Sequence, residues 1–156
     1  SEFRASTPDV WEPVFDRNLT GTFRCTRAVI NHMIGRRGGR IVNIGSTAGM
    51  HSEAGQCDYG AAKAGIIQFT KSLAREVGAF GINVNCVSPG MIFGTAASER
   101  VPRDISERGL VMQFFKRSDG RLGEPQDVAN AVVFLVSEES SFITGNNISV
   151  SGGIGI

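Results

Sequence analysis

The 156-residue sequence is poor in several residue types, and each scarcity argues against a class of protein. Three cysteines, an odd number without a CxxC pair, are typical of small buried thiols in a reducing compartment and not of a disulfide framework. A net charge of +1 argues against nucleic-acid binding, which usually leaves a strongly basic surface. Basic side chains do not cluster beyond Arg36-Arg37, which we interpret as a solvated helix end.

Long apolar runs are also missing. The longest, such as residues 131–136, are far too short to cross a bilayer, and no signal-peptide pattern opens the chain. A cytoplasmic protein without a membrane partner is therefore expected. The two histidines, His32 and His51, are interpreted as ordinary polar or half-buried residues, and no metal site is expected.

The rest of the composition, with 41% hydrophobic and 20% charged residues, is ordinary for a soluble globular protein, and the length suits one domain over residues 1–156. The opening Ser1-Glu2-Phe3 is either a cloning remnant or native sequence. No internal repeat or low-complexity tract divides the chain.

Hydrophobic periodicity and breaker residues divide the chain into alternating helices and strands. Helices are expected over residues 8–34, 58–78 and 124–136, with another near 104–115, and strands over 40–46, 82–87 and 147–153. This alternation predicts an α/β fold with a parallel, doubly wound, Rossmann-like sheet. Three strands make a thin sheet, however, and residues 41–44 are apolar on both faces, as in an interior strand. A neighbour is therefore expected to be missing from the open edge of the first strand.

The single tyrosine, Tyr59, is followed after four residues by Lys63, one of only three lysines. On a helix these positions share a face, so the phenol and the ammonium can meet. An ammonium in a partly desolvated cleft favours phenolate, which makes a phenol a usable proton donor and acceptor near neutral pH. Ser46 follows the carboxyl end of a predicted strand, where parallel α/β sheets bind ligands, and its hydroxyl could hold a carbonyl or alcohol oxygen.

Two interpretations of these residues are open. One is a surface tyrosine and lysine on an amphipathic helix, with a serine in a loop. The strand-end serine, the glycine-rich connector and the later Pro89-Gly90 break favour a site instead. Small residues beside the pair would let another backbone or a flat ligand approach, namely Gly60, Ala61, Ala64 and Gly65.

Three stretches, NIGSTAG at 43–49, DYGAAKAG at 58–65 and GINVNCVSPG at 81–90, resemble the short-chain dehydrogenase/reductase family, and the ending at 121–153 resembles its last helix and strand. The similarity is greatest to bacterial 3-oxoacyl-acyl-carrier-protein reductases and related sugar or alcohol dehydrogenases. This family transfers a hydride between NAD or NADP and a small carbonyl or secondary-alcohol substrate. Its members also assemble through the first two helices and the last strand, so a homo-oligomer, dimer or tetramer, is expected.

The resemblance implies a role for individual residues. Tyr59 would be the general acid/base, and Ser46 would orient the substrate oxygen. Lys63 would favour the ionised phenol and bind the nicotinamide ribose, and Asn18, within NLTGTF, would hold a water that passes protons onward. Taken alone, Asn18 could also mark a local helix irregularity, which is the less favoured alternative.

The resemblance also implies a cofactor site, to which Tyr59 and Lys63 contribute. Pro89 and Gly90 match the turn that flanks the nicotinamide, and the backbone at Ile92 would face its carboxamide. Thr95 lies one residue later than the threonine that usually grips the carboxamide or pyrophosphate. Residues 91–122 would form the substrate lid. Its apolar residues suggest a partly apolar pocket or could pack on the core, which is favoured for Phe114 and Phe115; they are Met91, Phe93, Met112, Phe114 and Phe115. Asn43 and Asn85 match structural asparagines of the family's strands.

The match runs from about residue 9 to residue 156 but covers only the second half of the family's domain. No strand, glycine-rich turn and helix of the pyrophosphate-binding kind occurs in the sequence, so the adenosine half of the cofactor site is expected to be absent. Either the sequence is a fragment of a longer reductase, or it is a whole product with little cofactor affinity, and the fragment is favoured.

Two other functions compete. A serine hydrolase is disfavoured because GSTAG places Thr47, not a serine, at the centre of a nucleophile elbow. A non-catalytic interaction fragment is the stronger rival, since a bare parallel edge invites association.

Overall fold

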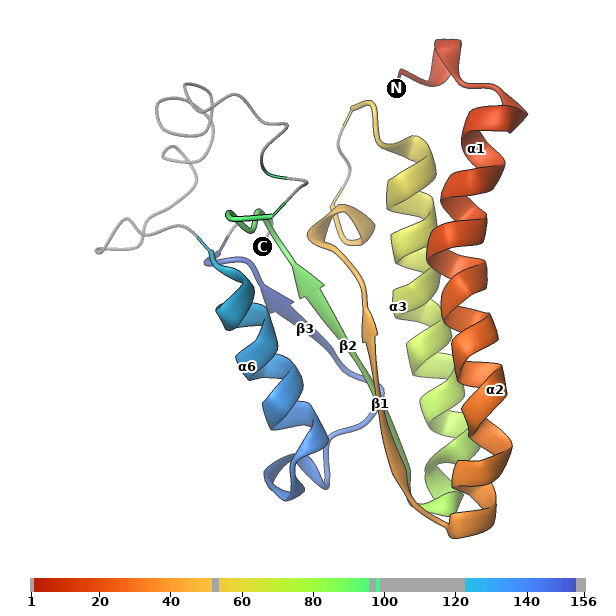
Figure 1. The fold of residues 1–156 in the computed structure, drawn as a ribbon, viewed down its shortest axis with the longest axis vertical. Coiled ribbons are helices and arrows are strands. Elements are labelled where there is room, and N and C mark those ends of the chain that lie inside the picture. Colours follow the sequence, from red (N-terminus) through yellow and green to blue (C-terminus); the bar gives the residue numbers. More distant parts are fainter. Residues whose placement is uncertain (1, 52–53, 96–97, 99–122, 154–156) are drawn as a thin grey trace.

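Three parallel strands form a sheet with helices on both faces in the computed structural model (Figure 1). The strands are β1 (Gly39–Ile44), β2 (Ile82–Pro89) and β3 (Asn147–Val150), and they lie in the order β1-β2-β3. The structure describes residues 2–51, 54–95, 98 and 123–153. The predicted parallel α/β fold is confirmed.

The first helix is longer and less regular than expected. It runs through α1 (Pro8–Phe15), a π-helical turn (Asp16–Thr20) and α2 (Gly21–Arg36), and α2 does not stop at Gly35. Arg37 ends α2 in the left-handed conformation, with φ 53°. Its N–H donates to the Ile34 carbonyl, and the capping of the last turn explains why the helix extends two residues beyond the predicted end.

The core lies between the sheet and the helix α3 (Cys57–Val77). The side of α3 that faces the sheet carries Ile66, Ala74 and Val77, all buried. On β2, alternate pleat faces are both covered, because α3 lies on one face and α6 (Pro125–Val136) on the other (Figure 1). The fully buried apolar residues of β2 are Ile82, Val84, Cys86 and Val87.

The β2 strand does not break after Val87, where Ser88-Pro89-Gly90 was expected to end it. Ser88 and Pro89 continue the parallel pairing with Ser149 and Val150 of β3. Proline lacks an N–H, but the next residue supplies one, since the Gly90 N–H donates to the Val150 carbonyl at 3.0 Å.

The helix α6 begins where its sequence predicts. Glu124 is the N-cap, Pro125 follows it, and the Asp127 carboxylate accepts from the Glu124 N–H at 2.9 Å, which completes a capping box. The sequence placed Asp127 in this acidic first turn, and that placement is confirmed.

Two buried amides anchor the strands. Asn43 donates to the Thr70 hydroxyl at 2.9 Å, and Asn85 donates to the Ile143 carbonyl at 2.8 Å. Both are scaffold residues, as expected. The cysteines are less uniform than predicted, because Cys25 and Cys57 are exposed and only Cys86 is buried.

The residues at the two ends of the segment expected to form a substrate lid contact each other. Ile92 bridges Gly123, and the Phe93 N–H donates to the Gly123 carbonyl at 2.8 Å. The helix predicted near 104–115 lies outside the described residues, together with Phe114 and Phe115. Within the described ranges, no helix is long and apolar enough to cross a membrane.

Candidate functional site

The predicted site residues gather at the carboxyl edge of the sheet. Because the strands are parallel, β1, β2 and β3 all end at this edge, where ligands bind in parallel α/β proteins. Ser46 follows β1. Pro89 is the last residue of β2, and the turn through Thr95 comes after it. The amino-terminal turns of α3 cover the end of β1.

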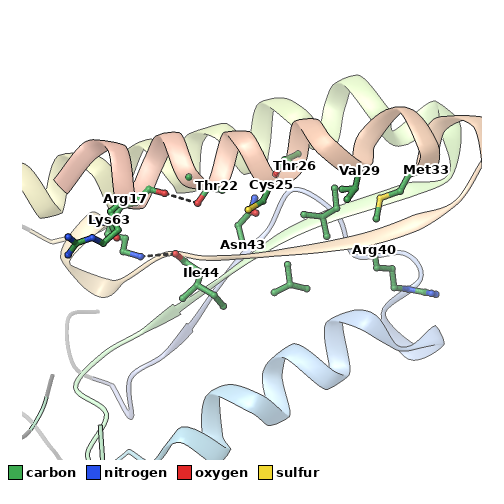
Figure 2. Close-up of a pocket in the computed structure, with 14 residues that line it drawn as sticks. Arg17, Thr22, Cys25, Thr26, Val29, Met33, Arg40, Asn43, Ile44 and Lys63 are labelled. Carbon is green, nitrogen blue, oxygen red and sulfur yellow. Dashed lines mark hydrogen bonds between the residues drawn. The ribbon is translucent and has the colours of Figure 1, made fainter. Parts of the chain in front are cut away.

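Tyr59 and Lys63 meet on α3. The Lys63 Nζ lies 5.6 Å from the centroid of the Tyr59 ring, which confirms their predicted proximity. The same Nζ donates to the Ile44 carbonyl, the last of β1, at 3.0 Å (Figure 2). Lys63 is only 9% exposed, whereas Tyr59 is 36% exposed, so the phenol remains accessible beside a buried cation.

Burial shifts the pKa of two groups near the Tyr59 phenol, the Lys63 ammonium and the Cys86 thiol. Desolvation lowers the pKa of the Lys63 ammonium, and the Cys86 thiol nearby acts in the opposite direction. Desolvation raises the pKa of Cys86 itself, and a hydrogen bond with Ser88 partly offsets it. Among the described residues, the Ile44 carbonyl and the Tyr59 ring are placed to stabilise the ammonium charge.

Ser46 caps a short 3-10 helix, η3 (Thr47–Gly49), and its Oγ accepts from the Ala48 N–H at 3.2 Å. This turn lies directly on α3, since a Cβ atom at Gly49 would lie 2.6 Å from the Ala64 nitrogen. On the other side, a Cβ atom at Gly60 would lie 2.9 Å from the Ala48 carbonyl oxygen. The small residues beside Tyr59 and Lys63 were expected to let either another backbone or a flat ligand approach. In the structure a backbone approaches them, and it belongs to the turn that follows Ser46.

Asn18 lies in the π-helical turn, so the helix irregularity is real, and the same residue borders a groove. Its side-chain amide donates to the Val14 carbonyl at 2.9 Å, and its own carbonyl accepts from the Thr22 hydroxyl at 2.8 Å. Asn18 and Lys63 line one groove of about 510 Å³ (Figure 2). π-Turns within α-helices are frequent at functional sites.

The residues predicted to contact the nicotinamide line a separate pocket. Pro89, Gly90, Ile92 and Thr95 border a volume of about 430 Å³ that reaches the first turn of α6. The Thr95 hydroxyl donates to the Ile92 carbonyl at 3.2 Å, and the Thr95 N–H donates to the Ser98 hydroxyl at 3.0 Å. Thr95 is therefore engaged in a local turn.

Two residues of the site were not predicted. The Asp58 carboxylate, 9% exposed, accepts from the Tyr59 N–H at 2.8 Å and fixes the first turn of α3. Cys86 is buried beneath Lys63. An aspartate at a helix start is a recognisable signal, whereas nothing local connects Cys86 with a lysine 23 residues away. Among the described residues, no group of three potential ligands is placed to hold a metal ion.

Comparison with known proteins gives concordant relatives. A family model described as Enoyl-(Acyl carrier protein) reductase matches residues 1–155. The chain is 46% identical over 151 residues to the acetoacetyl-CoA reductase of Shinella zoogloeoides, covering 97% of this chain and 61% of that protein. It is 42% identical over 146 residues to the 3-oxoacyl-[acyl-carrier-protein] reductase FabG of Vibrio harveyi, covering 94% and 58%.

Solved structures agree with these relatives. A crystal structure of 3-oxoacyl-[acyl-carrier protein] reductase from Brucella melitensis ATCC 23457 matches with a TM-score of 0.90 and 39% identity, covering 100% of this chain and 57% of that one. Another from Brucella melitensis, with bound NAD, has a TM-score of 0.85 and 38% identity. The chain spans less than two thirds of the length of these relatives. With a family model matched along nearly its full length and a parallel sheet shared with these reductases, the chain belongs to the short-chain dehydrogenase/reductase family.

Proposed function

We propose that the chain carries the proton-transfer groups of a NAD(P)-dependent reductase that interconverts a carbonyl and a secondary alcohol. The observation that carries this proposal is the buried Lys63 ammonium, 5.6 Å from the centre of an accessible Tyr59 ring at the carboxyl edge of the sheet. A lysine on a solvated helix face would be exposed, whereas Lys63 is only 9% exposed.

In the reducing direction, Tyr59 donates its phenolic proton to the carbonyl oxygen as the carbon is reduced. Lys63 stabilises the negative charge that this transfer leaves on the phenol, because a cation close to an anion in a partly desolvated cleft interacts strongly with it. Ser46 donates a hydrogen bond to the same substrate oxygen and orients it. Asn18 holds a water in the groove shared with Lys63, and this water returns a proton to the site.

A nicotinamide cofactor, NAD or NADP, supplies the hydride when it is bound. The residues present suit its nicotinamide end, because Pro89, Gly90 and Ile92 border one pocket beside the end of β2. Lys63 and Tyr59 would contact the adjoining ribose. Thr95 would contribute mainly through its place in the pocket wall, since its hydroxyl has intramolecular partners.

The substrate class follows from the relatives. Proteins 42–46% identical to this chain are named for acetoacetyl-CoA and for 3-oxoacyl groups on acyl-carrier protein. We therefore infer a 3-oxoacyl thioester as the substrate. Its keto group is small enough to reach Tyr59, and the half-buried Met91 and Ile92 offer apolar contacts for the acyl chain.

The test separates nucleotide binding from chemistry. NADH and NADPH are titrated against the chain and followed by nucleotide fluorescence, and turnover is measured after the segment of the Shinella relative that the chain does not match has been joined to it. Tyr59→Phe should lower turnover at least 100-fold and largely keep nucleotide binding, because the proton donor is lost while the ring, Lys63 and the pocket at Pro89 and Gly90 remain. Normal turnover by this variant would contradict the role of Tyr59. Absence of any fluorescence change at millimolar nucleotide would favour a non-catalytic role for the 156-residue chain.

A further inference from the structure

Asn147, the first residue of β3, joins three segments of the chain through its side-chain amide. Its Oδ1 accepts from the Ser88 hydroxyl at 2.7 Å, and its Nδ2 donates to the Met50 thioether at 3.1 Å. Ser88 lies near the end of β2, and Met50 ends the short helix η3 that follows Ser46. The two partners are 59 and 97 residues away from Asn147 in the sequence, so only the folded chain brings them together.

The bond to Ser88 supports the residue directly before Ser46. A Cβ atom at Gly45 would lie 2.5 Å from the Ser88 Oγ, so the Gly45 backbone lies directly against this side chain. The Gly45 N–H also donates to the Val87 carbonyl at 2.8 Å. Ser88 is fully buried, so its hydroxyl requires a partner inside the protein, and the Asn147 side chain supplies one.

The bond to Met50 holds the other end of the same turn. Met50 is 41% exposed, so packing alone does not fix its position, and the Asn147 amide adds a directed contact. Residues 45–50 are called the Ser46 turn below. Asn147 therefore supports the Ser46 turn at both ends, at Gly45 through Ser88 and at Met50 directly.

We propose that Asn147 is a positioning residue for Ser46, which it directs toward the substrate oxygen by fixing the Ser46 turn. The inference rests on the proposed function, in which the Ser46 hydroxyl orients that oxygen. The Ser46 Oγ accepts from the Ala48 N–H at 3.2 Å, so the turn uses the hydroxyl as an acceptor and its proton can point to a ligand. Orientation has a large effect on rate, because a displacement of about 1 Å can lower it about 100-fold.

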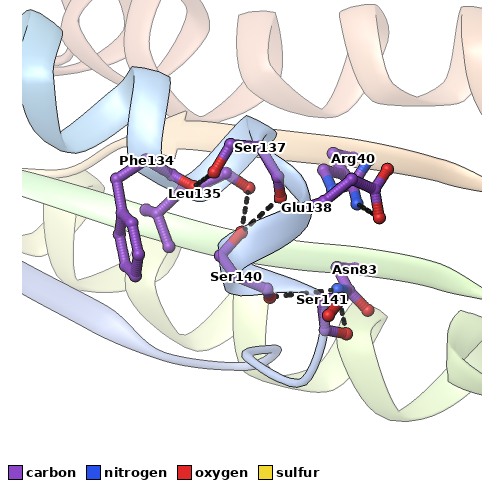
Figure 3. Close-up of polar contacts among 8 residues, drawn as sticks. All are labelled: Arg40, Asn83, Phe134, Leu135, Ser137, Glu138, Ser140 and Ser141. Atoms are coloured by element: carbon purple, nitrogen blue, oxygen red, sulfur yellow. Dashed lines mark hydrogen bonds and ion pairs between the residues drawn. The ribbon is translucent and has the colours of Figure 1, made fainter.

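A second asparagine provides a matched control at the opposite edge of the sheet. Asn83, the second residue of β2, donates to the Ser141 carbonyl at 2.8 Å and to the Ser140 carbonyl at 3.5 Å (Figure 3). Like Asn147, it is half-buried and connects β2 with a distant segment through its amide. It lies at the amino edge, in register with Arg40, and therefore far from the Ser46 turn.

Hydrogen exchange on the 156-residue chain tests whether Asn147 fixes the turn. The N–H groups of Gly49 and Met50 make hydrogen bonds of 3.0 and 2.8 Å within it, so their exchange reports on its opening. Asn147→Leu removes both bonds of the amide at similar size and should speed this exchange about fivefold, whereas Asn83→Leu should change it less than about twofold. Equal exchange in the parent and in Asn147→Leu, with both variants folded by circular dichroism, would overturn the proposal.

Turnover tests whether Asn147 acts through Ser46, and it is measured on the chain joined to the Shinella segment. Asn147→Leu should lower kcat about fivefold when Ser46 is present and less than about twofold in a Ser46→Ala background, because no hydroxyl is then left to position. Asn83→Leu should change kcat less than about twofold in both backgrounds.

The outcomes separate this inference from the proposed function. An equal loss of kcat with and without Ser46 would show general damage to the fold and would overturn the role of Asn147, while the reductase activity of the parent would stand. If the joined parent protein has no turnover, the proposed function fails, and hydrogen exchange still decides whether Asn147 fixes the Ser46 turn.

Discussion

The Lys63 side chain is buried beside the Tyr59 phenol, and the burial of its charge destabilises the folded chain. Its ammonium is buried beneath α3 with one carbonyl and one aromatic ring as partners, and burial lowers its pKa. A cation whose pKa is lower in the folded than in the unfolded chain destabilises the fold below the folded-state pKa. Strain of this kind is common at functional sites and is tolerated where chemistry needs it.

This sign gives a prediction of pH dependence. Lys63→Met replaces the ammonium with an apolar group of similar length, so the variant should be more stable than the parent at pH 7 and should lose reductase activity. Between the folded-state pKa and about 10.4, the parent recovers stability as it releases the proton, so the difference should shrink toward pH 10.5. Urea unfolding at several pH values measures it. A constant difference would show that the charge is not the cause.

At the scale of elements, glycines determine how the Ser46 turn meets α3. The turn η3 and α3 approach so closely that Gly49 and Gly60 leave no room for a Cβ atom. On the far side of α3, a Cβ atom at Gly65 would lie 2.9 Å from Leu19 Cδ2, next to Asn18 in the π-turn. Two segments therefore contact one stretch of α3, the η3 turn through its backbone and the π-turn through the Leu19 side chain, which places Ser46 and Asn18 relative to α3.

Gly49→Ala tests this contact. The new methyl group would meet backbone atoms of Lys63 and Ala64, which cannot rotate away, so we expect a loss of about 1–3 kcal/mol in the free energy of unfolding. Gly35→Ala is the matched control, because nothing lies within 4 Å of its Cβ position in α2, and it should raise stability by about 0.5–1 kcal/mol. Urea denaturation of both variants measures the difference, and a neutral Gly49→Ala would mean that the turn is free to move.

At the scale of the whole molecule, the two faces of α2 are exposed for different reasons. Val29 borders the groove beside β1, whereas Phe23, 51% exposed, does not line it. An exposed aromatic ring on this helix fits the homo-oligomer expected from the sequence, so we propose that Phe23 lies at a contact between copies of the chain. This contact is distinct from the groove beside β1, which Phe23 does not line.

Phe23→Glu should therefore weaken self-association at least tenfold, because a carboxylate replaces an aromatic ring at an apolar contact, and Val29→Glu should leave self-association unchanged. Sedimentation velocity over a range of chain concentrations measures both. If Val29→Glu alone dissociated the assembly, the copies would meet through the groove, contrary to the assignment of the two surfaces.

The sequence by itself determined the helices, the strands and the contacts within one helical turn, through its apolar periodicity and its local turn and cap signals. The helices and strands follow from apolar spacing and breakers, because these depend on neighbours within a few residues. The capping box of α6 and the encounter of Tyr59 with Lys63 follow for the same reason, since both lie within one turn of a helix. The family likewise follows from short motifs in the order of the chain.

Only the tertiary structure decided how far Lys63 is desolvated, how the Ser46 turn lies on α3, and where Asn18 sits in its π-turn. These depend on segments 15 to 45 residues apart, whose contact no local pattern encodes. The same holds for α2, where Val29 faces the groove beside β1 whereas its neighbour Ile30 is buried in the core. Apolar periodicity shows which side chains must be removed from water, but the packed molecule determines which segment lies over them.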